Sequence, residues 1–238
     1  MSRIPSRLIT ALGGLLFASG TQALPLIDAS VGARYWQADP SGNVAYESND
    51  QWSTGGDLGL DAEGTPNVYA RAAIPLITAD LEYTDLSYSG QVERSGTWGG
   101  QTVNVSRDAS LDAQLLHAGA MFSPPVPILD LGIGAGATRI DADAKLAGEN
   151  ASAQVTVPVA KAEIGADVPI LPLDARLRAN GIGYNGDTFY DVTAEVGVTW
   201  GVLRFDAGYR QIAVDFESND LTVDSDFSGP FAGAHLSF

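Results

Sequence analysis

The chain is 238 residues long, lacks cysteine and carries a formal charge of −16. This acidity argues against binding to nucleic acid, which depends on neutralising phosphates with basic residues. The lack of cysteine excludes disulfides and thiolate metal sites. With 27 glycines, 12 prolines and little helical patterning, the sequence favours one all-β domain. No later stretch of 18 apolar residues could form a membrane helix, but a transmembrane strand needs only about 9–11 residues with alternate apolar positions.

Residues 1–23 have the three parts of a secretory signal peptide. Arg3 and Arg7 form a basic start, a short apolar run follows, and a small-residue cleavage site ends at Ala23. Removing this segment leaves 11 basic and 29 acidic residues, a formal charge of −18. We therefore expect residues 24–238 to form the mature domain, with a soluble N-terminal helix as the alternative interpretation of the first segment.

Strict alternation of apolar and polar residues is the main signal of strands. It is clearest over residues 189–200, whose apolar positions are mostly Ala and Val with aromatic residues at the ends, as on a lipid-facing surface. We predict an antiparallel up-and-down transmembrane β-barrel with short periplasmic turns and longer extracellular loops. Eight strands is the alternative to ten, which are expected at about 27–38, 57–74, 77–88, 109–122, 128–142, 153–168, 173–184, 187–199, 202–216 and 225–238.

Three of these strands have weak patterns. Gly64-Thr65-Pro66 interrupts 57–74, and the two faces of 109–122 are mixed. In 153–168 the apolar residues change from odd to even positions near Pro158. Because an extra residue in one strand would shift the alternation in this way, the sequence predicts a β-bulge at Pro158.

A repeated motif marks the turns. Ile74-Pro75-Leu76-Ile77, Val126-Pro127-Ile128-Leu129 and Val168-Pro169-Ile170-Leu171 recur about 40–50 residues apart, and proline lacks a ladder donor, so it belongs at turns rather than in central strands. We expect three equivalent tight turns, with a fourth at Trp200-Gly201. The polar segments between them predict the opposite loops, at 39–56, 88–108, 143–151, 185–186 and 217–224.

The C-terminal tail alternates apolar residues back from Phe238 and resembles the signal strand of bacterial outer-membrane barrels. We expect Phe231, Gly233, Leu236 and Phe238 to carry the insertion signal that the barrel-assembly machinery reads. The chain as a whole resembles an uncharacterised family of small Gram-negative outer-membrane β-barrel proteins. The matching pieces are Gly32–Trp36, Leu81–Leu86, the proline turns, Gly208–Ile212 and Asp224–Phe231. The resemblance implies a location in the outer membrane of a Gram-negative bacterium and no activity.

Directly opposed residues of a hairpin share a face, so the turns predict which side chains meet in the lumen. A two-residue turn at Asn185-Gly186 pairs Arg176 with Glu195. A turn at Trp200-Gly201 pairs Asp191 with Arg210 and Glu195 with Asp206, and a turn at Pro75-Leu76 pairs Arg71 with Asp80. The expected lumen charge network comprises Arg71, Asp80, Arg176, Arg178, Asp191, Glu195, Arg204, Asp206 and Arg210. It either fills and rigidifies a narrow interior or forms a selectivity filter.

Catalytic groups are scarce. Of the two histidines, His235 is predicted in the lumen near the periplasmic end and His117 on the outer face, so neither is expected at the outer rim, where a barrel protease would need one. Acidic residues cluster near the last loop, from Asp215 to Asp226, but their spacing matches no calcium loop. We expect no metal, no cofactor and no enzymatic activity.

These observations leave three functions, in decreasing order of support. The first is a structural or surface-contact role for a barrel with a polar, charge-filled lumen. The second is a narrow pore for ions or small polar solutes, and the third is a lipid- or peptide-hydrolysing enzyme. The expected partners are outer-membrane lipid, lipopolysaccharide and the assembly machinery, with the protein as a monomer.

Overall fold

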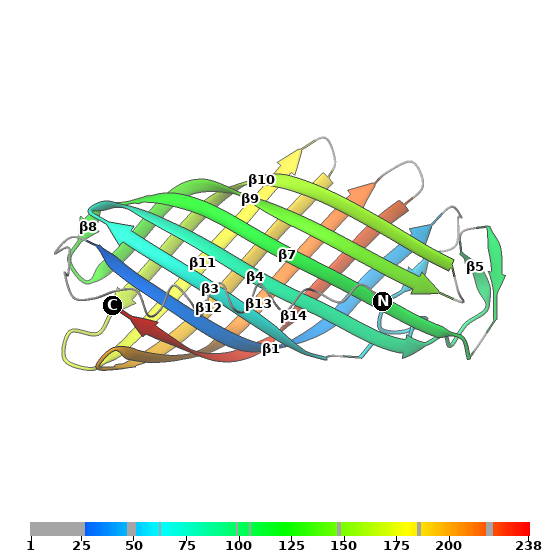
Figure 1. The fold of residues 1–238 in the computed structure, drawn as a ribbon, viewed down its shortest axis with the longest axis horizontal. Helices are drawn as coiled ribbons and strands as arrows, with labels where there is room; N and C mark the ends of the chain where they lie inside the picture. The colour runs from blue at the N-terminus through cyan, green and yellow to red at the C-terminus, as the bar shows by residue number, and fades with distance from the viewer. Residues whose placement is uncertain are drawn as a thin grey trace, which may run out of the picture.

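The computed structural model describes residues 27–46, 51–61, 63–98, 100–104, 106–146, 149–184, 187–217 and 221–238, so the expected signal peptide lies outside the described residues. Ten long strands form one antiparallel barrel, which closes where β10 pairs with β9 as well as β11 (Figure 1). This confirms the ten-strand barrel, and the alternative of eight is wrong. The long strands are β1 (Asp28–Tyr46), β3 (Glu63–Ile74), β4 (Leu76–Gln91), β7 (Asp108–Ser123), β9 (Leu129–Leu146), β10 (Glu149–Asp167), β11 (Leu173–Tyr184), β12 (Asp187–Trp200), β13 (Leu203–Glu217) and β14 (Leu221–Ser237).

Four short strands complete the fold: β2 (Trp52–Ser53), β5 (Gly96–Trp98), β6 (Gln101–Val103) and β8 (Pro125–Val126). The tight turns and the C-terminus lie at one end of the barrel, which we call the turn end, and β5 lies at the other, the loop end (Figure 1). Within the described part of the chain, no helix is long and apolar enough to cross a membrane.

The strands reach further toward the loop end than the sequence suggested. Much of the expected loops 39–56, 143–151 and 217–224 is strand, and Leu146 pairs directly with Glu149. The expected strand 57–74 instead starts at Glu63 and runs through Pro66, which pairs with Tyr35 of β1. The loop end is therefore formed mainly by the tips of long hairpins.

Two of the proline turns are alike. Pro75 and Pro127 are each followed by a residue with positive φ, 73° at Leu76 and 71° at Ile128, as in a type II turn. The third is a wider turn over 168–172, where the amide of Val168 donates to the carbonyl of Leu173. The prediction of three equivalent turns is thus wrong for the third.

The register of two hairpins is as predicted. Arg71 opposes Asp80, and Arg176 opposes Glu195. The β12–β13 hairpin is shifted by two residues, because Trp200 pairs with Leu203 and the turn is Gly201-Val202. A shift of two residues leaves every side chain on its predicted face but changes its direct partners.

The outer surface nearest the turn end is a broad apolar belt. Its exposed side chains come from all ten long strands, as a lipid-facing surface requires. Tyrosines lie where the belt gives way to polar residues, and aromatic residues also lie near the turns, in the manner of interfacial girdles. Exposed members include Tyr35, Val68, Leu81, Leu116, Phe122, Ile133, Ile164, Leu177, Tyr190, Val196, Trp200, Phe205, Tyr209, Leu236 and Phe238.

Toward the loop end the polarity of the two faces is reversed. The odd-numbered residues of β10 point inward from Ala151 to Gly165. Those nearer the loop end are the apolar Val155, Val157 and Val159, whereas those nearer the turn end include the charged Lys161 and Glu163. The outward residues change correspondingly from polar ones such as Ser152, Gln154 and Thr156 to Ala160, Ala162 and Ile164.

The predicted β-bulge at Pro158 is therefore wrong. The register between β9 and β10 is continuous from Glu149 to Ala166. The alternation changes face because the surroundings of the strand change, from lipid outside to water outside. The same reversal explains the mixed faces of β7, where Leu111, Ala113 and Leu115 point inward.

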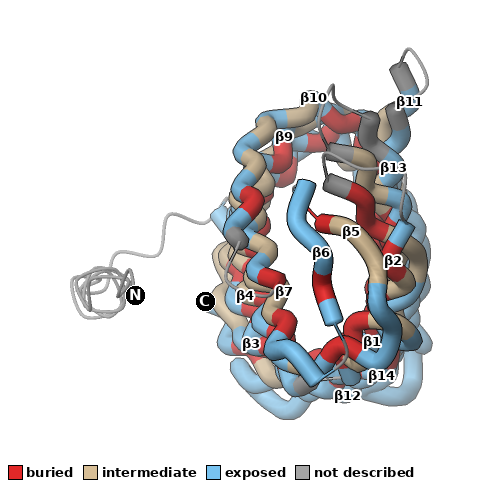
Figure 2. Tube along the Cα trace, turned by 90° about the vertical axis from the view of Figure 1, so that its right-hand side faces the viewer, coloured by how far each residue is buried: buried red, intermediate tan, exposed pale blue. Residues whose placement is uncertain are grey.

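The two long loops fold over the mouth of the barrel, where β5 and β6 lie across the opening (Figure 2). The indole of Trp52 donates to the carbonyl of Thr97 at 2.9 Å, and Asp57 contacts Arg94 at 3.4 Å. The buried apolar side chains of these two loops join the hydrophobic core in the half of the barrel nearer the loop end, which we call the upper barrel. The half nearer the turn end is the lower barrel. We call residues 51–61, 92–98 and 100–104 the cap.

Candidate functional site

The nine charged residues expected in the lumen all occupy inward positions in the lower part of the barrel, and several pair with residues that the sequence did not single out. Ion pairs connect them across the lumen as well as along neighbouring strands. The additional members of this network are Arg34, Glu82, Asp130, Lys161, Glu163 and Asp174. Except for Asp174, Asp206 and Arg210, the charged residues line a cavity of about 590 Å³ that reaches the turn end.

Arg34 is the centre of one cluster. Its guanidinium contacts Glu195 at 2.6 Å and Asp206 at 2.8 Å, and its side chain is only 5% exposed. Glu195 also accepts hydrogen bonds from Arg178 at 2.9 Å and Arg204 at 3.0 Å. Arginine suits this position because its planar fork can bridge two carboxylates that would otherwise repel each other.

Arg34 is further held by aromatic rings. Its guanidinium carbon lies 4.4 Å from the ring centre of Tyr69 and 4.9 Å from that of Phe231. Arg204 forms a second set of hydrogen bonds, to both carboxylate oxygens of Asp174. These contacts fix the arginines in place, so the cluster is a packed layer and not a set of mobile charges.

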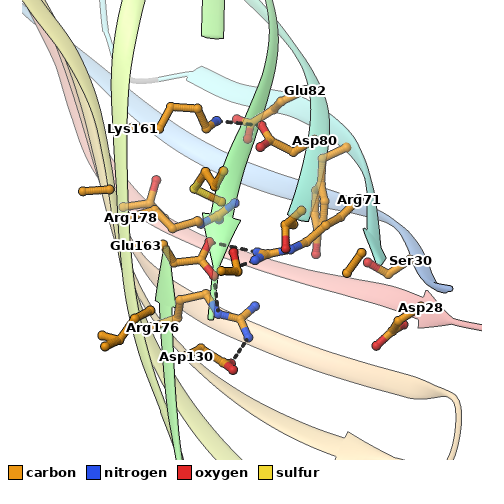
Figure 3. Close-up of a pocket in the computed structure, with 18 of the residues that line it drawn as sticks. Asp28, Ser30, Arg71, Asp80, Glu82, Asp130, Lys161, Glu163, Arg176 and Arg178 are labelled. Carbon is orange, nitrogen blue, oxygen red and sulfur yellow. Dashed lines mark hydrogen bonds and ion pairs between the residues drawn. The ribbon is translucent and has the colours of Figure 1, made fainter. Parts of the chain in front are cut away.

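Nearer the turn end, a second cluster crosses the lumen (Figure 3). Arg71 of β3 donates two hydrogen bonds to Glu163 of β10, at 2.7 and 2.8 Å. Arg176 contacts the same carboxylate at 3.5 Å and Asp130 at 3.2 Å. Arg71 and Arg176 thus oppose their predicted partners, Asp80 and Glu195, in the strand ladder but bind other carboxylates.

Asp80 belongs to a third cluster. Lys161 donates to it at 2.7 Å, and His117 Nε2 lies 3.3 Å from the same carboxylate oxygen. Thr138 contacts the other ring nitrogen of His117 at 2.9 Å. The prediction that His117 lies on the outer face is wrong, because β7 keeps its odd residues inward. Gly119 leaves the space that the stem of Lys161 occupies.

A fourth cluster lies deepest in the barrel. Arg210 of β13 contacts Asp191 at 2.7 Å and Glu82 of β4 at 2.8 Å, so it also connects opposite walls. Thr84 accepts a further bond at 3.1 Å, and the ring of Trp36 lies 5.1 Å from the guanidinium. Beyond this layer the inward residues become apolar.

The other histidine lies where the sequence predicted. His235 is buried in the lumen and contacts the hydroxyl of Tyr69, with the two rings edge to face. Both histidines of the chain therefore lie in the lower lumen. Neither lies at the loop end, where a substrate outside the cell would arrive.

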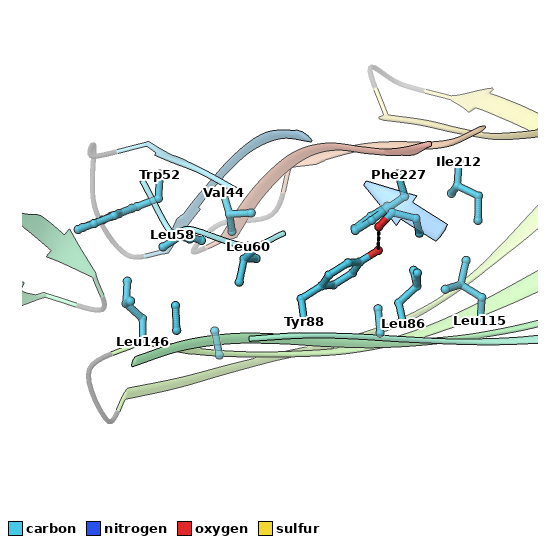
Figure 4. Close-up of a cluster of buried hydrophobic side chains, with 14 of the residues drawn as sticks. Val44, Trp52, Leu58, Leu60, Leu86, Tyr88, Leu115, Leu146, Ile212 and Phe227 are labelled. Atoms are coloured by element: carbon cyan, nitrogen blue, oxygen red, sulfur yellow. Dashed lines mark hydrogen bonds between the residues drawn. The ribbon is translucent and has the colours of Figure 1, made fainter. Parts of the chain in front are cut away.

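A second cavity, of about 500 Å³, lies in the upper barrel; we call it the apolar chamber. Most of its wall is aliphatic and aromatic, and the polar residues that line it are Gln154, Thr188, Asp215 and Ser225. The side chains around it include Leu86, Leu115, Ile212 and Phe227 (Figure 4). Ile212 is the next inward residue after Arg210, so the chamber begins where the charged layers end.

The residues of the expected insertion signal divide between the two faces of β14. Leu236 and Phe238 are exposed on the belt, whereas Phe231 is buried against Arg34. A side chain at Gly233 would collide with Arg34. Gly233 is thus needed for the charge network, and the outward pair provides the apolar end of the strand.

Pairing within hairpins could not find Arg34, Lys161 and Glu163, because their contacts join strands that are not neighbours in the sheet. Arg34 of β1 and Asp206 of β13 are separated by β14 and lie 172 residues apart in the sequence. Inward polar residues flanked by apolar neighbours were the available signal, but only pairs on adjacent strands could be assigned. Among the described residues, no group of three or more acidic or histidine side chains could hold a metal ion.

No family model matches this chain, and no curated protein sequence matches it. Solved structures do resemble it. The outer-membrane protease OmpT of Escherichia coli has a TM-score of 0.56 at 10% identity, over 93% of this chain and 99% of that one. Neisserial surface protein A gives 0.38 at 14% identity over 89% and 97%, and the toluene transporter TodX of Pseudomonas putida 0.39 at 10% over 90% of each chain. The likeness to OmpT shows the fold alone, and the weaker two carry no argument.

The fold is thus that of Gram-negative outer-membrane barrels. The apolar belt, the polar lower lumen and the closed sheet agree with it, because a membrane-spanning sheet must leave no edge unpaired in lipid. The protein is a small outer-membrane β-barrel whose upper half projects into water.

Proposed function

We propose that this protein is a closed, non-conducting outer-membrane barrel with a structural or surface-contact role. The observation that carries the proposal is that ion pairs join opposite walls of the lumen. Arg71–Glu163 connects β3 with β10, and Arg210–Glu82 connects β13 with β4. In each case four steps around the barrel separate the two strands.

A ten-stranded barrel is wider than the eight-stranded kind that side chains just fill. Long arginines from several strands occupy this extra width here. Opening a path would separate buried, hydrogen-bonded charges, and breaking one such pair costs about 3–5 kcal/mol. The charged layers therefore favour a lumen that stays shut to ions.

The upper half supports a surface role. Its outer face is polar, its hairpins extend beyond the belt, and Arg139 and Asp141 form an exposed ion pair at 2.9 Å on β9. Hydrogen bonds from Arg139 and Gln154 lower the pKa of Asp141, so this carboxylate stays ionised and hydrated on the outer face. We propose that the barrel is a monomer that contacts lipopolysaccharide and membrane lipid, and that the assembly machinery inserts it through β14.

A narrow pore is the second candidate, favoured by the polar cavity of about 590 Å³ that reaches the turn end. A hydrolase is the least supported, since the two histidines lie inside the lower lumen and are held by Thr138 and Tyr69.

Planar-bilayer recording separates the first two candidates. A closed barrel predicts that the purified wild-type protein gives no stable ohmic steps. Reproducible single-channel steps that change on Arg204→Ala, but not on the exposed control Arg139→Ala, would overturn the closed barrel and support the pore.

A further inference from the structure

Small inward side chains on three neighbouring strands leave the apolar chamber hollow. Ala113 of β7, Ala142 of β9 and Ala153 of β10 oppose one another in the ladders and point inward. Ala144 and Ala151 repeat the arrangement one step further toward the loop end. Small side chains on one wall face larger ones on the other and leave a space between them.

The chamber is closed above and below. The cap covers its loop end, with Trp52, Leu60 and Trp98 almost fully buried. The Arg210 layer forms its floor. Its volume of about 500 Å³ falls within the range of about 300–1,000 Å³ that is typical of small-molecule sites.

One polar group in this wall lacks a partner. Ser225 of β14 points inward, lines the chamber and is only 3% exposed. Its Oγ has no hydrogen-bond partner among the residues that the structure describes. A buried hydroxyl without a partner costs free energy, so it indicates a group that is supplied from outside the chain.

The barrel wall beside the chamber lacks strand pairing at one seam. Pairing between β10 and β11 ends at Ala160 and Gly181, although β11 continues to Tyr184 and β10 to Glu149. Pro158 lies at this point and cannot donate to a ladder. The two strands diverge toward the loop end (Figure 1), and the exposed Gln154 and Pro158 line the chamber beside the gap.

From these features we infer that the apolar chamber is a binding site for an uncharged, mostly apolar small molecule with one hydrogen-bonding group. The mostly apolar wall disfavours a charged ligand, and none of the described residues that line it is basic, so an anion would be buried there without a partner. Ser225 is the hydrogen-bonding partner inside the chamber. The seam, which starts at the upper edge of the lipid belt, is the route of entry.

The inference is tested by equilibrium dialysis of protein in nanodiscs against three probes: 1-naphthol, naphthalene and the anion 1-naphthoate. Empty nanodiscs give the background from lipid partitioning. The wild-type protein is expected to bind 1-naphthol and naphthalene saturably, one per barrel, and to bind 1-naphthoate at least tenfold more weakly. Saturable binding no greater than the background would overturn the inference.

Variants locate the site. Ala142→Phe fills the chamber and should abolish binding of both neutral probes, whereas Ser152→Phe adds the same ring to the outer face of β10 and should leave binding unchanged. Ser225→Ala should weaken 1-naphthol roughly 5- to 10-fold and leave naphthalene unaffected, since it removes one hydrogen bond.

Before dialysis, each variant must show the heat-modifiable band shift of a folded barrel in gel electrophoresis. If Ala142→Phe does not fold, Ala153→Phe replaces it. Equal affinity of the filled and wild-type proteins would overturn the site, and an unselective Ser225→Ala would overturn the role of the hydroxyl. Neither result depends on whether the lower lumen conducts.

Discussion

Replacing Arg34 with methionine should destabilise the barrel strongly, and the structure indicates which charge is responsible. Glu195 keeps two other arginines, Arg178 and Arg204, when Arg34 is lost. Asp206 has Arg34 as its only ion-pair partner among the described residues, and its side chain is fully buried. The expected loss is therefore that of one uncompensated buried charge, about 3–5 kcal/mol of the free energy of unfolding.

A second variant separates this cause from lost packing. Asp206→Asn in the Arg34→Met background removes the orphaned charge, so the double variant should recover about 2 kcal/mol relative to Arg34→Met. The exposed pair Arg139–Asp141 provides the control, because such pairs contribute about 0–1 kcal/mol. Arg139→Met should therefore change the stability by less than about 1 kcal/mol.

The assay is urea unfolding of protein refolded into lipid vesicles, followed by the gel band shift and tryptophan fluorescence. The reasoning would be refuted by an Arg34→Met variant no less stable than Arg139→Met. It would also be refuted by a double variant whose loss equals the sum of the two single losses.

Three further outcomes follow from the fold. Ile128→Gly should stabilise the barrel by about 1 kcal/mol, since it relieves a β-branched residue at φ 71°, whereas Ile170→Gly, in the turn without positive φ, should not; equal effects in urea titrations would contradict this. Val196→Arg on the belt should cost about 2–4 kcal/mol, and Thr156→Arg on the polar outer face of β10 less than about 0.5, again by urea titration; similar costs would place the membrane boundary elsewhere. Phe238→Ala should lower the amount of folded protein in the outer membrane of expressing cells but not the yield of refolding in detergent, and equal losses in both would remove its role as an insertion signal.

The strand number, the two-faced strands and two of the hairpin registers could be predicted because they depend on local signals. Asn185-Gly186 is a strong sequence signal for a two-residue hairpin turn, and Pro75 presets φ in its turn. The β12–β13 turn was misplaced because glycine was assigned the second turn position. In the structure Gly201 takes the first, with φ 64°, as in primed hairpin turns.

The charge partners and the chamber depend on what faces what across the barrel. Arg71 and Glu163 lie on strands that never pair, so no ladder argument could join them. The change of the apolar face at Pro158 was located correctly, but it was attributed to a β-bulge in the backbone. The sequence shows which face of a strand is hydrophobic. It does not show whether that face meets lipid or the barrel interior, and this changes along a strand that leaves the membrane.

That reversal is the centre of the account, and the natural lack of cysteine allows it to be tested directly. Single cysteines introduced along β10 from 151 to 166, each carrying a spin label in lipid vesicles, report collision with oxygen in lipid and with a nickel chelate in water. We predict that odd positions are shielded throughout, even positions from 160 to 166 meet oxygen, and even positions from 152 to 156 meet the chelate. A change from even to odd exposed positions at Pro158 would mean a bulge, and would contradict both the reversal and the apolar chamber built on it.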